Sequence, residues 1–424
     1  DFAGTFPTTA KAPTNTSDIA RANNYVSSEF DQTEMPTTET DSGLYMKTKA
    51  DGSQAGLNDL EGKGEATVFN DDLLYEIGAD YDSPKLQQLV EQMTPAELAH
   101  VVEDSGFGTP AIASIGKPRT YDFDGPAGFN SNTQTGISSG EWTAFPNETL
   151  VGQTLSKFVA KQMGLSMGLE GQATSLSGWY APGVNLHRSP FNARNYEYYS
   201  EDPVLSGYMA ANVIEGAKAN GLYAYLKHFT LSEPGINARN LNTWLTEQNF
   251  RENYLKPFEI AVKKGGANAI MTAFNSVGGS WAGASYAMNV EILRDEWGFR
   301  GSLITDWSTG DGNMNTNAGL KGGNDIWLNP NTGNSASKIN RNDPTMIYCA
   351  QHAAKDVIYT YANTYQYAKH YDHSNDDLKA PIGENQITPP FAWWIPVLAS
   401  IDAAVAIGLG IWLYFVLRKP RQKA

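Results

Sequence analysis

The segment Gly301-Ser-Leu-Ile-Thr-Asp306-Trp307 runs a short apolar stretch directly into a carboxylate and a large aromatic side chain. The turn signal Phe299-Arg300-Gly301 and a helix-like stretch at 286–297 precede it, so residues 302–305 are predicted to form a strand. Asp306 would then lie at the carboxyl end of the strand, where (β/α) barrels build their active sites. An Asp at a strand end is also a common turn or helix N-cap residue, so this segment alone leaves both interpretations open.

Four apolar runs farther upstream also end on residues suited to a binding site. The run 119–123 is followed by Asp124, the run 179–186 by Arg188 and Arg194, the run 222–226 by Lys227 and His228, and the run 267–270 by Met271 and Phe274. The intervals between the runs are about the length of one strand, one helix and two loops. These residues are therefore predicted to meet at one edge of a sheet.

Helical patterns fill the intervals between the predicted strands. Residues 205–219 are predicted to form a helix that ends at Asn220-Gly221, a left-handed stop signal. Residues 247–264 place apolar side chains on one helical face, with a kink expected at Pro257. Alternating strands and helices favour a parallel sheet, so the predicted fold class is α/β, a (β/α)8-type TIM-like barrel.

In this order, the motifs resemble those of glycoside hydrolase family 3, the retaining β-glycosidases. The resemblance covers about residues 85–370 and rests on several ordered motifs. The matching stretches are Asp124-Gly-Pro-Ala-Gly128, Arg188-Ser-Pro190, Ala193-Arg194-Asn195, Ser200-Glu-Asp-Pro203, Lys227-His-Phe229, Arg251 to Glu259 and Thr305-Asp306-Trp307. Two positions depart from the family pattern: Ala193 replaces the usual Gly, and Phe274 replaces the Tyr of many members.

The resemblance implies that Asp306 is the nucleophile that forms a glycosyl-enzyme. It also implies a set of substrate-binding residues, namely Asp124, Arg188, Arg194, Lys227, His228, Met271, Phe274 and Trp307. Neighbouring Lys and Arg side chains are expected to lower the pKa of the nucleophile and keep it ionised. Two alternatives stay open: Trp307 could be an ordinary core residue, and Lys227-His228 could belong to a salt bridge at the barrel rim.

The general acid is missing from the recognised motifs. A retaining glycosidase needs a second carboxyl group about 5 Å from the nucleophile. In most of the family this Glu lies on an α/β sandwich domain that follows the barrel, whereas only a short tail follows the barrel motifs here. Residues 1–8 loosely resemble an element near the end of that sandwich, so we expect a circularly permuted member with the sandwich upstream of residue 1. Within the chain, Glu233 is the first candidate for an internal acid.

The flanks of the barrel motifs have their own patterns. Residues 1–84 are predicted to be an extended, linker-like segment, with the end of the upstream sandwich as the open alternative, and residues 85–375 the barrel. After a stalk at 376–390, the apolar run 391–417 is long enough for a transmembrane helix. The basic tail 418–424 would be cytoplasmic and the barrel extracellular, on a single-pass membrane protein. Asp402 and Pro396 keep a buried core helix open as the alternative.

Composition narrows the possible functions. The chain has 424 residues and a formal net charge of −15, which disfavours nucleic acid as a partner. Its single cysteine, Cys349, excludes an internal disulfide framework, and its six histidines show no convincing metal spacing. No phosphate loop or dinucleotide fingerprint is found, so no cofactor is expected.

Two functions therefore remain. The first is a retaining, exo-acting β-glycosidase of the β-glucosidase type, which hydrolyses terminal non-reducing β-linked sugars. The second is a non-catalytic, membrane-anchored glycan-binding protein that has lost its general acid.

Overall fold

The computed structural model describes residue 77 and residues 80–130, 142–233, 238–308, 314–329, 338–343, 345–364 and 394–417. The chain divides into two compact units, residues 1–374 and residues 375–424. Among the predicted flanking segments, residues 1–76, the stalk at 376–390 and the tail at 418–424 lie outside the described ranges.

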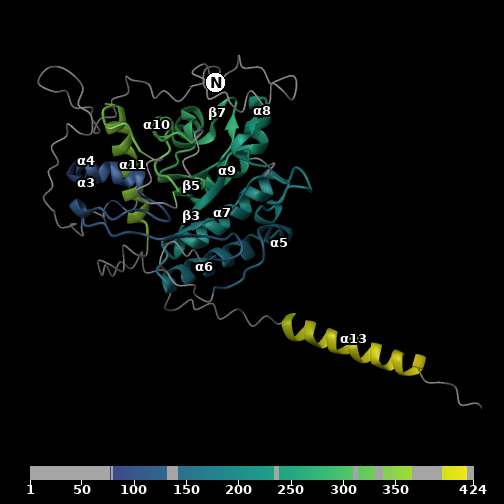
Figure 1. Ribbon diagram of the computed structural model, residues 1–424. Helices are drawn as coiled ribbons and strands as arrows, with labels where there is room; N and C mark the ends of the chain where they lie inside the picture. Colours follow the sequence, from purple (N-terminus) through teal and green to yellow (C-terminus); the bar gives the residue numbers. More distant parts are fainter. Residues whose placement is uncertain are drawn as a thin grey trace, which may run out of the picture. The chain divides into compact units, whose positions relative to one another are not determined.

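The centre of the first unit is a parallel sheet of five strands (Figure 1). Neighbouring strands all pair in parallel, in the order β1-β2-β3-β5-β8. The strands are β1 (Asp122–Asp124), β2 (Gly178–Tyr180), β3 (Tyr223–Phe229), β5 (Ala269–Thr272) and β8 (Ser302–Thr305). The strand predicted at 302–305 is confirmed, and the carboxyl ends of all five strands lie at one edge of the sheet.

The eight strands predicted for the barrel are not all formed in the described part of the chain. At one edge of the sheet a single parallel bridge joins Ile304 to Ile326. At the other edge, the N–H groups of Asp122 and Thr120 donate to the carbonyls of Phe107 and Thr109. Pro110 has no N–H group to donate, which disfavours extension of this segment into a strand. A small second sheet contains β4 (Asn242–Thr243), β6 (Ser276–Val277) and β7 (Ser280–Trp281).

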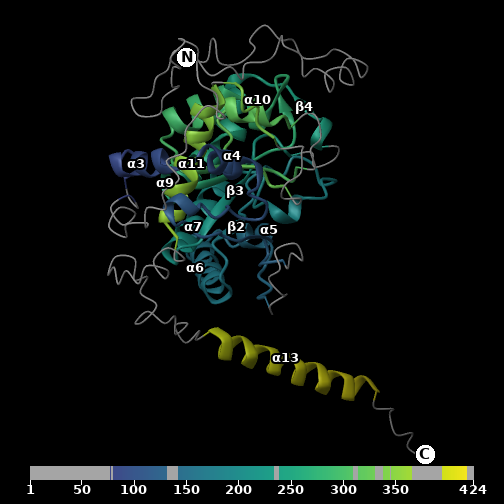
Figure 2. The same cartoon turned by 60° about the vertical axis from the view of Figure 1, so that its left-hand side comes forward.

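Helices pack against the central sheet and against each other (Figures 1 and 2). Helix α6 packs on α7, and α7 packs on α9. A Cβ atom at Gly164 of α6 would lie 2.0 Å from the Val213 carbonyl oxygen of α7, so this crossing requires glycine. The helices are α3 (Pro84–Gln92), α4 (Pro95–Glu103), α5 (Glu148–Gln153), α6 (Lys157–Thr174), α7 (Pro203–Ala219), α8 (Glu247–Asn249), α9 (Lys256–Gly265), α10 (Thr316–Lys321) and α11 (Thr345–Ala362).

Local signals explain where α7 begins and ends. The Asp202 carboxylate caps the helix by accepting from the N–H groups of Val204 and Leu205, at 2.7 and 3.0 Å. Pro203 fits the first turn, where no N–H is needed. Gly221, just beyond the helix, has a φ of +68°, which glycine adopts readily. The helix predicted at 205–219 is therefore confirmed.

The other predicted helix, 247–264, is divided. After α8 the chain forms a π-helical turn, η6 (Phe250–Tyr254), and α9 then begins at Lys256. Pro257 lies in the first turn of α9, so it starts a helix instead of kinking one. The helix-like stretch at 286–297 is also π-helical, as η8 (Ala287–Glu296).

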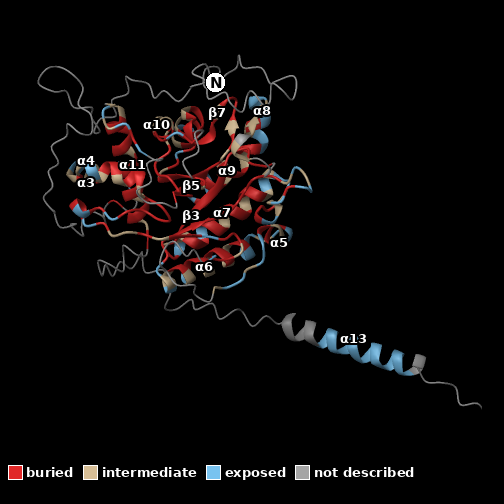
Figure 3. Ribbon diagram, in the orientation of Figure 1, coloured by how far each residue is buried: buried red, intermediate tan, exposed pale blue. Residues whose placement is uncertain are grey.

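Both faces of the central sheet are buried (Figure 3). Tyr225 and Ile304 point into an apolar cluster that includes residues of α3, α4 and α11. Their neighbours Leu226 and Leu303 point into a second cluster with residues of α6, α7 and α9. This alternation follows the two-residue period of a strand, and burial on both faces is typical of parallel sheets.

The second unit contains α13 (Trp394–Leu417), inside the apolar run predicted at 391–417. Its residues 400–414 are exposed. Among the residues described by the structure, no helix has both the length and the apolar character needed to cross a membrane. The predicted helix is therefore present, but its membrane-spanning role is not confirmed.

Candidate active site

The predicted polar residues converge at the carboxyl ends of the parallel strands. Asp124 ends β1, Lys227 and His228 lie near the end of β3, and Asp306 follows β8 directly. Arg194 precedes the short 3-10 helix η4 (Asn195–Glu197), which lies in the loop after β2. The side chains thus come from four strands or the loops that follow them, as in other (β/α) active sites, and β3 supplies two of them.

Asp306 is buried, with 8% of its surface exposed. Its Oδ1 accepts a hydrogen bond from the Trp307 N–H at 2.6 Å. Its Oδ2 accepts no hydrogen bond from any residue described by the structure. One oxygen of Asp306 is therefore held by a hydrogen bond, and the other keeps its acceptor capacity free.

The pKa of Asp306 differs from the sequence-based expectation. Burial raises the pKa of this carboxyl group to about 6. Arg194, the Trp307 N–H and Lys227 oppose this rise, and Asp124 adds to it. The two cations therefore do not hold the pKa below its usual value, because the cost of burying the carboxylate outweighs their attraction.

A charged network surrounds Asp306. Lys227 Nζ donates to Asp124 Oδ1 at 2.8 Å and lies 3.5 Å from Glu197 Oε2. Arg194 Nε donates to Glu197 Oε1, so Glu197 links the two cations. Burial lowers the pKa of Lys227, but Asp124 and Glu197 outweigh it and raise the pKa. Burial likewise raises the pKa of Asp124, and Lys227 reverses this and lowers it.

His228 is buried, and its surroundings favour the neutral ring. Burial, followed by the charges of Arg194 and Lys227, lowers the pKa of His228 well below its usual value. Arg194 Nη2 donates to Nε2 at 2.8 Å, so the ring proton belongs on Nδ1, 3.4 Å from Asn185 Oδ1. An Nε2 that accepts from Arg194 cannot also donate to Asp306 Oδ2, which lies 3.5 Å away. This explains why Oδ2 is left free.

Four of the predicted substrate-binding residues lie outside this network. Arg188 is exposed, with its guanidinium 5.4 Å from the centre of the Tyr254 ring. Met271 is buried in the apolar core, and Phe274 lies under the guanidinium of Arg239 at 4.9 Å. Trp307 contacts Asp306 through its backbone, and its ring is 5.5 Å from Phe107. The salt-bridge alternative for Lys227 is partly correct, because it pairs with Asp124 within the site.

Glu197, the buried carboxylate that bridges Arg194 and Lys227, was not predicted from the sequence. Its spacing of three residues from Arg194 was the available signal, because it allows a pair within one helical turn. Asn185 was also missed. Its Oδ1 accepts from the His228 backbone N–H at 2.8 Å, and its Nδ2 donates to the His228 carbonyl at 3.1 Å.

Glu233, the candidate internal acid, is buried. Its Oε1 accepts long hydrogen bonds from Asn185 Nδ2 at 3.3 Å and from the Leu186 N–H at 3.4 Å. Burial raises its pKa to about 7, so this carboxyl group can hold a proton near neutral pH. It is only 1% exposed, however, which keeps it from a leaving group that arrives from solvent.

Within the described ranges, no three His, Cys, Asp or Glu side chains come together as a group that could hold a metal ion. The arrangement is a free carboxylate oxygen among cations and hydrogen-bonding groups. Such an arrangement is suited to nucleophilic attack on a bound, hydroxyl-rich molecule.

The chain is similar in sequence to proteins named as beta-glucosidases. Beta-glucosidase A of Butyrivibrio fibrisolvens is 35% identical over 229 residues, which are 52% of this chain and 27% of that protein. Thermostable beta-glucosidase B of Acetivibrio thermocellus is 30% identical over 260 residues, 60% of this chain and 34% of that protein. The chain thus spans about a third or less of the length of these relatives.

A solved structure and a family model agree with these relatives. Beta-glucosidase 3B from Thermotoga neapolitana in complex with glucose has 29% identity and a TM-score of 0.60, over 69% of this chain and 44% of that chain. The likeness supports a TIM-like (β/α) fold. Residues 124–342 match the glycosyl hydrolase family 3 N terminal domain. Because this match covers just over half of the 424 residues, the chain belongs to glycosyl hydrolase family 3.

Proposed function

We propose that this chain carries the nucleophile of a retaining, exo-acting β-glucosidase. The single observation behind the proposal is the free, buried Oδ2 of Asp306 between Arg194, His228 and Lys227. Oδ2 forms a bond to the anomeric carbon as the glycosidic bond breaks, and the leaving oxygen takes a proton. Water then cleaves the glycosyl ester, which restores the carboxylate and retains the anomeric configuration.

The surroundings of Asp306 suit the hydroxyl groups of a sugar. Asp124 is half exposed at the edge of the site and offers acceptor oxygens beside the Lys227 ammonium group. Arg194 and His228 offer further polar atoms close to Oδ2. Charged donors and acceptors in fixed positions bind hydroxyl groups strongly. The choice of glucose rests on the relatives, which are named β-glucosidases.

We further propose that the general acid comes from an α/β sandwich domain outside these 424 residues, in a circularly permuted arrangement. The engagement of these carboxyl groups supports an external acid, because Asp124 and Glu197 hold Lys227 and Glu233 is buried. The permuted order is supported by the loose resemblance of residues 1–8 to an element of that sandwich. The sandwich would then supply the second carboxyl group that a retaining mechanism requires.

Two kinds of substrate test this proposal. A nitrophenolate leaves readily as an anion, whereas a sugar leaving group needs the proton, and general acid catalysis is worth about 10² to 10⁴ in rate. The 424-residue chain should therefore cleave nitrophenyl β-glucoside slowly and cellobiose hardly at all. Adding the sandwich domain should accelerate cellobiose cleavage by about 10² or more, and nitrophenyl glucoside cleavage far less. Initial rates with both substrates measure the effect.

Two other outcomes would change the assignment. Similar, high rates on both substrates without the sandwich would place the acid within the chain, and Glu233→Gln would then test its first candidate. Glucose binding with cleavage of neither substrate would favour the alternative, a non-catalytic glycan-binding protein. Glu233→Gln also serves as a control, because under the proposal it should leave nitrophenyl glucoside cleavage largely intact.

We also propose that the barrel unit lies outside the cell and is held at the cell membrane by the apolar run 391–417. Sequence supports this: aromatic residues lie near both ends of the run, and the tail 418–424 is basic. Protease added to intact cells should digest the barrel unit and leave the basic tail protected. Removal of residues 391–424 should move the protein to the soluble fraction. A protected barrel, or a truncated protein that stays with the membrane, would overturn the proposal.

A further inference from the structure

A cavity lies at the opposite end of β8 from Asp306. Its volume is about 630 Å³, within the range of small-molecule sites. It is lined by side chains of η8, α10 and α11, together with Tyr81 and residues next to β8. Four strand residues separate its floor from Asp306, a distance of about 13 Å at 3.3 Å per residue. The cavity is therefore separate from the candidate active site.

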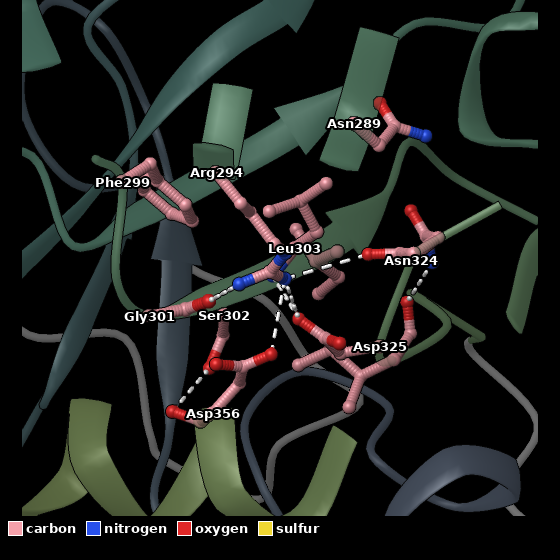
Figure 4. Close-up of polar contacts among 12 residues, drawn as sticks. Asn289, Arg294, Phe299, Gly301, Ser302, Leu303, Asn324, Asp325 and Asp356 are labelled. Atoms are coloured by element: carbon pink, nitrogen blue, oxygen red, sulfur yellow. Dashed lines mark hydrogen bonds and ion pairs between the residues drawn. The ribbon is translucent and has the colours of Figure 1, made fainter. Parts of the chain in front are cut away.

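Its floor is a buried polar cluster centred on Arg294 (Figure 4). The guanidinium donates to the Gly301 carbonyl at 3.1 Å and to Asp325 Oδ2 at 2.9 Å, and it lies 3.0 Å from Asp356 Oδ2. Asp325 Oδ2 also accepts from the Leu303 N–H of β8 at 2.6 Å. The floor of the cavity thus holds the amino end of the strand that leads to Asp306.

The charges of the lining argue against an ionic ligand. The lining contains four Asp carboxylates and four Lys or Arg cations, so it carries no net charge. The cations are also engaged: Arg294 by two carboxylates, and Lys321 by Asp343 at 3.2 Å. Arg300 and Lys355 lie over the Tyr81 ring, at 5.2 and 4.1 Å. An incoming ion would have to displace these partners.

The same lining suits a neutral molecule with many hydroxyl groups. An ionised carboxylate has about four acceptor sites, so paired Asp side chains still have acceptors for hydroxyl groups. Tyr348 and His352 pack edge to face, with ring centroids 4.4 Å apart, and form an aromatic part of the wall. An aromatic wall beside fixed polar groups fits a molecule with both C–H faces and hydroxyl edges.

We propose that this cavity is a second sugar-binding site, which takes a neutral mono- or disaccharide. The choice of glucose as the probe rests on the proposed function, whereas the sugar class follows from the lining. A bound sugar would contact the groups that hold Leu303, so the site is connected through β8 to the strand end at Asp306.

Equilibrium dialysis with radiolabelled glucose tests the proposal through the number of sites. The wild-type chain should bind two glucose molecules, one at each end of β8. Lys227→Ala removes a cation of the candidate active site and should retain the cavity site. Val290→Trp fills the cavity from η8 and should retain the other site. Val159→Trp is a matched substitution at an exposed position of α6, and this variant should still bind two glucose molecules.

A variant with a smaller change guards against misfolding of Val290→Trp. His352→Ala should weaken binding at the cavity site by about tenfold or more, the loss expected for one good polar contact and its aromatic surface. Circular dichroism checks that each variant is folded. The proposed second site would be overturned if the wild-type chain has a single glucose site that Lys227→Ala abolishes. It would also be overturned if Val290→Trp and His352→Ala both keep two sites of unchanged affinity.

Failure of the proposed cavity site can be distinguished from failure of the proposed glucosidase function. Cleavage of nitrophenyl β-glucoside by a chain with one glucose site would refute the cavity alone. Glucose bound in the cavity of a chain without cleavage would refute the glucosidase alone.

Discussion

Asp306→Ala is expected to reduce nitrophenyl β-glucoside cleavage by about 10⁴-fold or more, which is typical of removing a nucleophile. The free Oδ2 is the proposed attacking atom, and no water in its place could form the glycosyl ester. The fold should survive, because burial raises the pKa of this carboxyl group and its removal relieves that cost. Initial rates and thermal unfolding measure the two effects. Asp80→Ala, on an exposed residue outside the site, is the matched control.

A mechanism-based label gives a second, independent measurement. An activated fluoro-sugar should become attached to Asp306, and peptide mass spectrometry after proteolysis would locate it. Labelling of another carboxylate would show that the nucleophile lies elsewhere.

The pH dependence of the wild-type chain belongs to the same prediction. Attack requires the ionised carboxylate, and the pKa of Asp306 is raised to about 6. The value of kcat/KM should therefore be steady above this pH and fall about tenfold per unit below it. A steady kcat/KM from pH 7 down to pH 4.5 would contradict the buried environment of Asp306.

Arg294→Met is expected to destabilise the folded chain by about 3 to 5 kcal/mol, as when one partner of a buried ion pair is removed. The arginine ties η8 to Asp325 beside β8 and to Asp356 of α11 (Figure 4). Without it, the two carboxylates remain buried next to each other. Urea unfolding measures the loss.

Arg251→Met is the matched control for this substitution. Arg251 is partly exposed and pairs with Glu296 at 2.7 Å on the surface of the same region. A surface pair contributes about 0 to 1 kcal/mol, so this variant should unfold close to the wild type. Equal, small losses in both variants would show that the buried cluster does not hold these elements together.

The loss of folding stability in Arg294→Met should also depend on pH. Burial, and next the charge of Asp356, already raise the pKa of Asp325 well above its usual value. A carboxyl group whose pKa is raised by folding binds more protons in the folded chain, so its contribution to stability falls as pH rises. Removing the arginine raises that pKa further. The variant should therefore lose more stability at pH 8 than at pH 5.

Sequence alone determined the features that depend on neighbouring residues. The strand at 302–305 follows from an apolar run between a turn and Asp306, and the end of α7 follows from the Asn220-Gly221 stop signal. The family motifs are also local, so Asp124, Lys227 and Asp306 could be selected before their positions in space were known. Parallel order then placed these residues at one edge of the sheet.

Tertiary structure decided what depends on burial and on residues far apart in the chain. Lys227 and Asp124 pair across 103 positions, and Glu197 joins them to Arg194. The free oxygen of Asp306 follows from the direction in which Arg194 donates to His228. The rise of the Asp306 pKa is a balance between desolvation and nearby charges. Because no sequence pattern records how far water is excluded, only the folded structure could give its sign.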